Sequence, residues 1–198
     1  MAGIRWHEGV RIGRAIFFLS LFLPGAPLTS YAKKPFMIEA LSSVQYEVKR
    51  PRNDLRAFDG PEFIARHLPG LKGISTVEKD LLRWDLEIKV PLAKRMAGSF
   101  PARRKIVNPD LITYETPDKK APDYMFCETF VKATSARSVS IKITLYLRFT
   151  RSSGWKFHWL APFVGEKFLG AKVKERLDGM LAAFVESSKK EFEAPRPA

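Results

Sequence analysis

The longest regular pattern of apolar and polar residues in this chain covers residues 163–192. At about 100° per residue, the spacing of an α-helix, its apolar side chains gather on one stripe, formed by Leu169, Val173, Leu177, Met180, Leu181 and Phe184. The charged residues of the segment fall mostly on the other side, which would face water. The pattern predicts a long amphipathic helix whose stripe is buried against the strands that precede it.

Two segments alternate between apolar and polar residues, which is the pattern of a half-buried β-strand. The more regular one covers residues 139–149, and the other covers residues 82–90. Further strands are predicted at residues 44–48, 74–79, 99–107, 111–115 and 124–133, the last without a clear register because both of its faces carry apolar groups. Strands of this kind belong to an antiparallel sheet with one wet face.

Two short helices fit between the first strand and the second, at residues 54–58 and 61–67. Pro61 suits the first position of a helix, and Pro69 with Gly70 would end it. The order of elements predicts an α+β fold in which a curved antiparallel sheet of about seven strands wraps around the long C-terminal helix. A cavity can remain between the sheet and that helix.

The first 36 residues differ from the rest. Arg5, Arg11 and Arg14 precede an apolar run at residues 15–23, and the sequence Ser30-Tyr31-Ala32, which ends in a small residue, follows. This resembles an export signal, and the alternative is that translation starts at Met37. We therefore expect a leader (1–36), a folded domain (37–193) and a tail (194–198). The protein would be cytoplasmic if it starts at Met37, and exported or membrane-associated through residues 1–32 otherwise.

The 198-residue chain has 34 Lys and Arg against 21 Asp and Glu, a net charge of +13. This favours an acidic protein, an acidic membrane surface or, less readily, nucleic acid as partner, although diffuse charge also describes an ordinary solvated surface. Cys127 is the only cysteine, which excludes an intrachain disulfide and a cysteine-based zinc site. No phosphate-binding glycine motif and no nucleophile elbow is present, and no cofactor is expected. No metal is expected either, because His158 has no second histidine at metal-binding spacing.

Residues 51–74 read PRNDLRAFDGPEFIARHLPGLKGI. This segment resembles the START and polyketide-cyclase (SRPBCC, helix-grip) superfamily, and most closely its branch that contains the G-type subunit of carbon monoxide dehydrogenase. The positions that match are Asp59, Pro61, Glu62, Leu68, Pro69 and Gly70. The chain departs from that branch at Leu55, where a large aromatic residue is common, in its N-terminal leader, and in having no membrane anchor after the last helix.

The resemblance implies a cavity for a hydrophobic ligand, because members of the superfamily bind lipids, sterols, polyketides or hormones, and a few catalyse cyclisation. Members of the carbon monoxide dehydrogenase branch are implicated in membrane attachment or in handling an electron carrier. A non-catalytic binder or carrier of a hydrophobic small molecule or lipid is the function we expect here. The alternatives are a cyclase or aromatase, or an accessory protein that docks on an acidic partner or membrane surface.

The predicted apolar wall of the cavity comes from the alternating strands and the helix stripe: Trp84, Leu86, Ile88, Ile141, Ile143, Leu145, Val173, Leu177 and Met180. Each of these side chains could instead simply pack as core. Gly170 would make room for a ligand or for a closely packed strand, or would mark a kink. Glu166, one turn earlier, either points into the pocket or lies at the surface near the helix start.

Residues 155–163, WKFHWLAPF, place His158 and Trp159 in an aromatic cluster just ahead of the helix. The cluster fits a pocket lid or a lipid-facing lip, because Trp beside cationic residues suits a membrane interface. The alternative is a strand edge that packs its aromatic side chains under the helix. If the protein were an enzyme, Glu166 and His158 would be its acid–base pair.

Overall fold

The computed structural model describes residues 34–51, 60–90 and 96–194. Most of the predicted leader, the first short helix (54–58) and all but one residue of the predicted tail lie outside this part of the chain. The described elements are β1 (Phe36–Val48), α1 (Pro61–His67), β2 (Leu71–Glu78), β3 (Leu81–Ile88), β4 (Met96–Asn108), β5 (Leu111–Glu115), β6 (Asp123–Ser135), β7 (Ser138–Arg151), a 3-10 turn η2 (Gly154–Lys156) and α2 (Ala161–Glu193).

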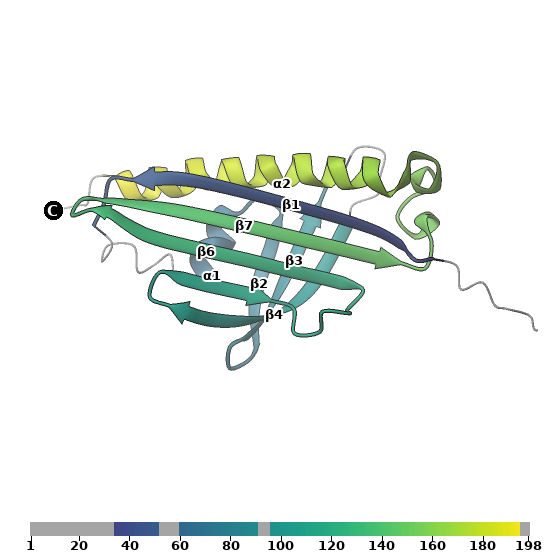
Figure 1. Cartoon of the computed structure of the whole chain (residues 1–198), viewed down its shortest axis with the longest axis horizontal. Helices are drawn as coiled ribbons and strands as arrows, with labels where there is room; N and C mark the ends of the chain where they lie inside the picture. Colours follow the sequence, from purple (N-terminus) through teal and green to yellow (C-terminus); the bar gives the residue numbers. More distant parts are fainter. Residues whose placement is uncertain (1–33, 52–59, 91–95, 195–198) are drawn as a thin grey trace, which may run out of the picture. The chain divides into compact units, whose positions relative to one another are not determined.

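The strands form one antiparallel sheet in the order β1-β7-β6-β5-β4-β3-β2. The predicted α+β class is confirmed: a seven-stranded antiparallel sheet packs against a long C-terminal helix in a helix-grip arrangement (Figure 1). The sequence left the register of β6 open, and the structure settles it. The inward-facing residues of β6 pair with buried residues of β7: Met125 with Leu147, Cys127 with Leu145, Thr129 with Ile143, and Val131 with Ile141.

The stripe predicted for the long helix is buried. Its six side chains are at most 9% exposed and belong to one core with the inward faces of the strands. The helix is longer than predicted by a few residues, and it is interrupted at Gly165. There the backbone takes φ 80° and ψ 166°, a conformation that favours glycine, and the main body of the helix begins after it.

α2 lies along β1, the edge strand that precedes it by more than a hundred residues (Figure 1). Polar contacts join the two elements in parallel order: Glu166 with Met37, Asp178 with Ser42, and Ser188 with Tyr46. Beyond β1, Arg50 donates to the carbonyl oxygens of Phe192 and Ala194. Helix and strand therefore match in direction and length.

The segment before the helix is not a strand. Residues 154–156 form the 3-10 turn η2, and further turns lead into α2 at Ala161. Of its aromatic side chains Phe157 is buried against Phe36, with ring centroids 5.7 Å apart, whereas Trp155 and Trp159 are exposed. The interpretation as a strand edge is therefore wrong, because β7 already ends at Arg151. In the described part of the chain, no helix is both long and apolar enough to cross a bilayer.

Candidate ligand-binding site

The nine predicted wall residues all lie in the space between the sheet and α2, at most 9% exposed. They come from β3, β7 and α2 and contact one another as parts of a single core. Trp84 packs edge-on against Tyr114 of β5, with ring centroids 5.1 Å apart. The predicted set is therefore brought together, and in this structure its members are packed against neighbouring side chains.

A small internal cavity lies between the sheet and the C-terminal half of the helix. Its volume is about 10 Å³, and its lining residues are Ile64, Leu68, Cys127, Thr129, Ile143, Leu145, Leu181 and Phe184. Because one water molecule needs roughly 10–15 Å³, the cavity holds one water at most. Ile143 and Leu145 belong to the predicted wall, whereas the residues from β6 and from the α1 segment were not predicted.

Two polar groups face this otherwise apolar cavity. The Thr129 side chain is 3% exposed, and its hydroxyl makes no hydrogen bond of normal geometry within the described residues. Its polar neighbour is the thiol of Cys127, a weak partner. Burial raises the pKa of that thiol to about 12, so the thiol stays neutral at physiological pH. The cavity thus presents a buried hydroxyl without a strong partner.

Glu166 does not point into the core. Its carboxylate oxygen Oε1 accepts a hydrogen bond of 2.7 Å from the backbone N–H of Met37, at the start of β1. This contact fixes the edge strand to the first regular turn of the helix. Glu166 also lines an open surface groove of about 530 Å³ with Met37, Glu39, Ala40, Leu41, Lys167, Gly170, Ala171 and Lys174.

Gly170 lies where the helix passes close to the backbone of β1. A Cβ atom at this position would be 2.9 Å from the carbonyl oxygen of Glu39, closer than real Cβ contacts. Of the interpretations that the sequence allowed, the geometry therefore supports room for a closely packed strand. A side chain here would push the helix off the edge of the sheet.

His158 and Trp159 lie outside the core, in the turn before α2. The backbone N–H of Leu160 donates to His158 Nδ1 at 3.2 Å, and the Trp159 side chain is 62% exposed. Among the hydrogen bonds of the described residues, none joins His158 to Glu166, so the two proposed acid–base groups do not form a pair. The residues described also contain no cluster of three His, Cys, Asp or Glu side chains that could hold a metal ion.

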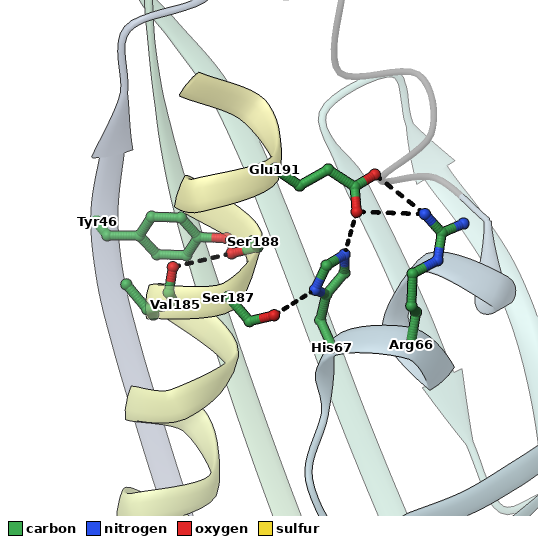
Figure 2. A network of polar contacts seen from close by, with 7 residues as sticks. All are labelled: Tyr46, Arg66, His67, Val185, Ser187, Ser188 and Glu191. Carbon is green, nitrogen blue, oxygen red and sulfur yellow. Dashed lines mark hydrogen bonds and ion pairs between the residues drawn. The ribbon is translucent and has the colours of Figure 1, made fainter. Parts of the chain in front are cut away.

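A polar network that the sequence did not predict joins α1 to the end of α2 (Figure 2). The ring of His67 lies between Ser187 Oγ, 2.7 Å from Nδ1, and Glu191 Oε2, 2.8 Å from Nε2. Arg66 donates to both oxygens of Glu191 at 3.1 and 3.2 Å. His67 is far from Ser187 in sequence, so no local pattern could reveal the contact.

The order Ser187–His67–Glu191 resembles the polar chain of a serine hydrolase, but its setting is structural. Ser187 lies within α2, where the backbone N–H groups are already bonded to carbonyl groups of the preceding turn. A hydrolase needs free donors beside the nucleophile to stabilise an oxyanion. The network is therefore best understood as the connection that holds α1 against α2.

A second surface pocket lies on the other side of α2, beside β3. Its volume is about 290 Å³, and it is lined by Pro69, Gly70, Lys72, Glu87, Ile88, Lys89, Arg176 and Met180. Ile88 and Met180 are predicted wall residues that form its apolar part. The charged residues at its rim were not among the predicted site residues, because they lie on three separate elements.

Comparison with known proteins places the chain by its fold. No family model and no curated protein matches the sequence. A START superfamily protein from Mycobacterium smegmatis shares 14% identity and a TM-score of 0.54, over 77% of this chain and 97% of that one. The Zhui aromatase/cyclase from Streptomyces sp. R1128 shares 15% identity and a TM-score of 0.54, over 80% and 99%.

These similarities show that the chain has the START and polyketide-cyclase (SRPBCC) fold. At such low sequence identity, the similarities are evidence for the fold only. The narrower resemblance to the carbon monoxide dehydrogenase branch stays a prediction from residues 51–74, of which residues 52–59 lie outside the described part of the chain.

Proposed function

We propose that the protein binds or carries a hydrophobic small molecule or lipid, without catalysis, in the space between the sheet and α2. The observation that carries this proposal is the internal cavity beneath the helix, with apolar walls and the Thr129 hydroxyl among them. A buried hydroxyl whose only polar neighbour is a weak partner, the Cys127 thiol, lowers the stability of the fold. A ligand with an acceptor group would remove that penalty while its apolar part replaced core contacts.

The cavity must enlarge to hold such a molecule, because ligand pockets typically measure about 300–1,000 Å³. The polar contacts of α2 are made with β1, with Arg50 and with α1. Beside β3, the helix contributes Arg176 and the apolar Met180 to the lining of a surface pocket. We infer that α2 moves away from β3 while its contacts with β1 persist.

Titration with the neutral fluorescent probe N-phenyl-1-naphthylamine tests this proposal. The wild-type chain is expected to bind the probe, with enhanced fluorescence. Leu181→Trp adds more bulk than the internal cavity can hold and occupies the space into which it would enlarge, so this variant should weaken binding by about tenfold. The control is Leu41→Trp, which adds the same bulk at a side chain that is 53% exposed on β1.

Native mass spectrometry of the protein purified from its own cells supplies the second measurement. We expect a co-purifying apolar compound that organic extraction releases. A wild-type chain that neither binds the probe nor carries such a compound would contradict the proposal.

A second candidate function, docking on a membrane with acidic headgroups, is favoured by the turn before α2 together with the first turn of that helix. Trp155, Trp159 and Phe163 are 56%, 62% and 72% exposed, and the rings of Trp155 and Phe163 are in contact, with centroids 5.6 Å apart. Exposed aromatic groups of this size are typical of interaction surfaces. The sequence contains no acidic residue between Arg151 and Gly165, whereas Lys156 and Lys167 are exposed.

Co-sedimentation with vesicles tests the docking surface. The wild-type chain should bind vesicles that contain phosphatidylserine more tightly than vesicles of phosphatidylcholine alone, because each nearby cation adds about 1 kcal/mol at an anionic surface. The variant Trp155→Ser/Trp159→Ser/Phe163→Ser should lose most of this binding. Ile106→Ser/Val107→Ser, which removes two other exposed apolar side chains on β4, serves as control. Equal loss in both variants would contradict the assignment.

A further inference from the structure

The pocket beside β3 and the internal cavity are lined by residues that are neighbours in the chain. Leu68 lines the cavity, and the next two residues, Pro69 and Gly70, line the pocket. In α2, Leu181 lines the cavity and Met180 lines the pocket. Residues 68–70 and residues 180–181 therefore border both spaces, and a ligand that used both would have to displace them.

Met180 is suited to such a displacement. Its methyl carbon lies 3.3 Å from where a Cβ of Gly70 would be, so the absence of a side chain at Gly70 gives the methionine its place. Gly70 also has φ +81°, and its carbonyl oxygen accepts a hydrogen bond of 2.8 Å from Glu87 N, which fixes the turn. A methionine side chain is unbranched and flexible, so it can rotate without disturbing the fixed turn.

The rim of the pocket is cationic. Lys72, Lys89 and Arg176 line it, together with one acidic residue, Glu87, whose carboxylate lies 3.3 Å from Lys72 Nζ. Three cations against one carboxylate leave an excess of two positive charges. Lys89 and Arg176 are exposed and come from different elements, because Lys89 follows β3 and Arg176 belongs to α2.

The inner part of the pocket is apolar, because Ile88 and Met180 face it. At about 290 Å³ the pocket is slightly smaller than the usual range for a complete ligand, about 300–1,000 Å³. It has room for a charged group and the first part of a tail. The rest of such a molecule would have to pass Met180 into the cavity beneath the helix.

We propose that this pocket is the entrance of the ligand site and that the ligand is an amphiphile with an anionic headgroup, a carboxylate or a phosphate. Lys89 and Arg176 bind the headgroup, with Lys72 beside them, and the apolar tail passes Met180 into the cavity. The inference rests on the proposed function, since it needs the space beneath α2 to accept an apolar chain. Beyond the proposed function, the inference specifies the charge of the ligand and the side of α2 from which the ligand enters.

Binding of cis-parinaric acid, compared with its uncharged methyl ester, tests the inference. The wild-type chain is expected to bind the acid about tenfold more tightly than the ester. In Lys89→Gln/Arg176→Gln the affinity for the acid should fall by about tenfold, to that of the ester, while the affinity for the ester is unchanged. Dodecyl phosphate, as competitor, tells whether a phosphate headgroup is preferred to a carboxylate, and inorganic phosphate alone should not compete.

Lys105→Gln/Lys132→Gln is the matched control, because it removes the same charge from exposed positions on β4 and β6, outside the pocket. Its affinity for the acid should equal that of the wild type. Equal binding of acid and ester by the wild type, or equal effects of the two double variants, would overturn the anionic entrance and leave hydrophobic binding standing. A wild-type chain that binds neither acid nor ester would overturn both proposals.

Discussion

Gly170 and Gly179 occupy the same helix, yet their surroundings are opposite. At Gly170 an added Cβ would be 2.9 Å from a backbone oxygen of β1, and at Gly179 it would meet nothing within 4 Å. Glycine within a helix normally lowers stability by about 0.5–1 kcal/mol relative to alanine, because the unfolded chain loses more freedom. At Gly170 that loss is balanced by the close approach of helix and strand.

Replacing Gly170 by alanine is therefore expected to destabilise the protein by about 1–2 kcal/mol, since the backbone oxygen of Glu39 cannot rotate away as a side chain would. The free energy of unfolding from urea titration measures the effect.

The matched control is Gly179→Ala, which should stabilise the protein by about 0.5–1 kcal/mol. If the two variants had the same stability, the close approach of α2 and β1 at Gly170 would be wrong.

At the scale of elements, polar side-chain contacts join the edge strand β1 to the last helix α2 at several points along their length. Asp178 is a central member: Ser42 Oγ donates to its Oδ1 at 2.5 Å, and Lys174 Nζ donates to its Oδ2 at 2.6 Å. Lys174 first, and then Ser42, hold the pKa of Asp178 below its ordinary value. The carboxylate form is thus preferred in the folded protein.

This direction gives a pH dependence. A carboxyl group whose pKa is lower in the folded state contributes its stabilisation above the unfolded pKa, about 3.9, and loses it as the pH falls through the folded value. Asp178→Asn should therefore be less stable than the wild type at neutral pH, by less than about 1 kcal/mol because the pair is half-exposed. The difference should disappear in strongly acidic solution.

Glu175→Gln is the control for Asp178. Glu175 is paired with Lys172 on the same helix, but that pair contacts no second element in the described contacts. Thermal unfolding between neutral and acidic pH should therefore show a smaller change in this variant. An effect as large as that of Asp178→Asn would mean that the contact with Ser42 contributes nothing to the joining of helix and strand.

At the scale of the whole molecule, local patterns predicted the architecture, because β7 and the helix each have one apolar face. They could not assign the register of β6, since Phe126 and Phe130 on its outer face are themselves half-buried. The position of the cavity was predicted only in part. A gap of about 10 Å³ depends on how side chains from four segments fit together, and no periodicity encodes that.

Surface chemistry was harder to predict than the fold. The helical period placed Glu166 in line with the stripe, but at that turn the stripe has reached the edge of the sheet and meets the backbone of β1. The cationic pocket combines Lys72 of β2, Lys89 after β3 and Arg176 of α2, which come together only in three dimensions. Charged residues that are far apart in the sequence can thus lie close together in the folded protein.

The pairing of β1 with β7 and α2 also has a consequence for synthesis on the ribosome. β1 is made before the other strands, but its partners follow about a hundred residues later or more, so it has no neighbour while the strands from β2 to β6 emerge. Until α2 is released, the apolar face of those strands faces water. Such long-range pairing is slow and exposes the chain to aggregation. We expect the nascent protein to need a chaperone until its last helix closes over the sheet.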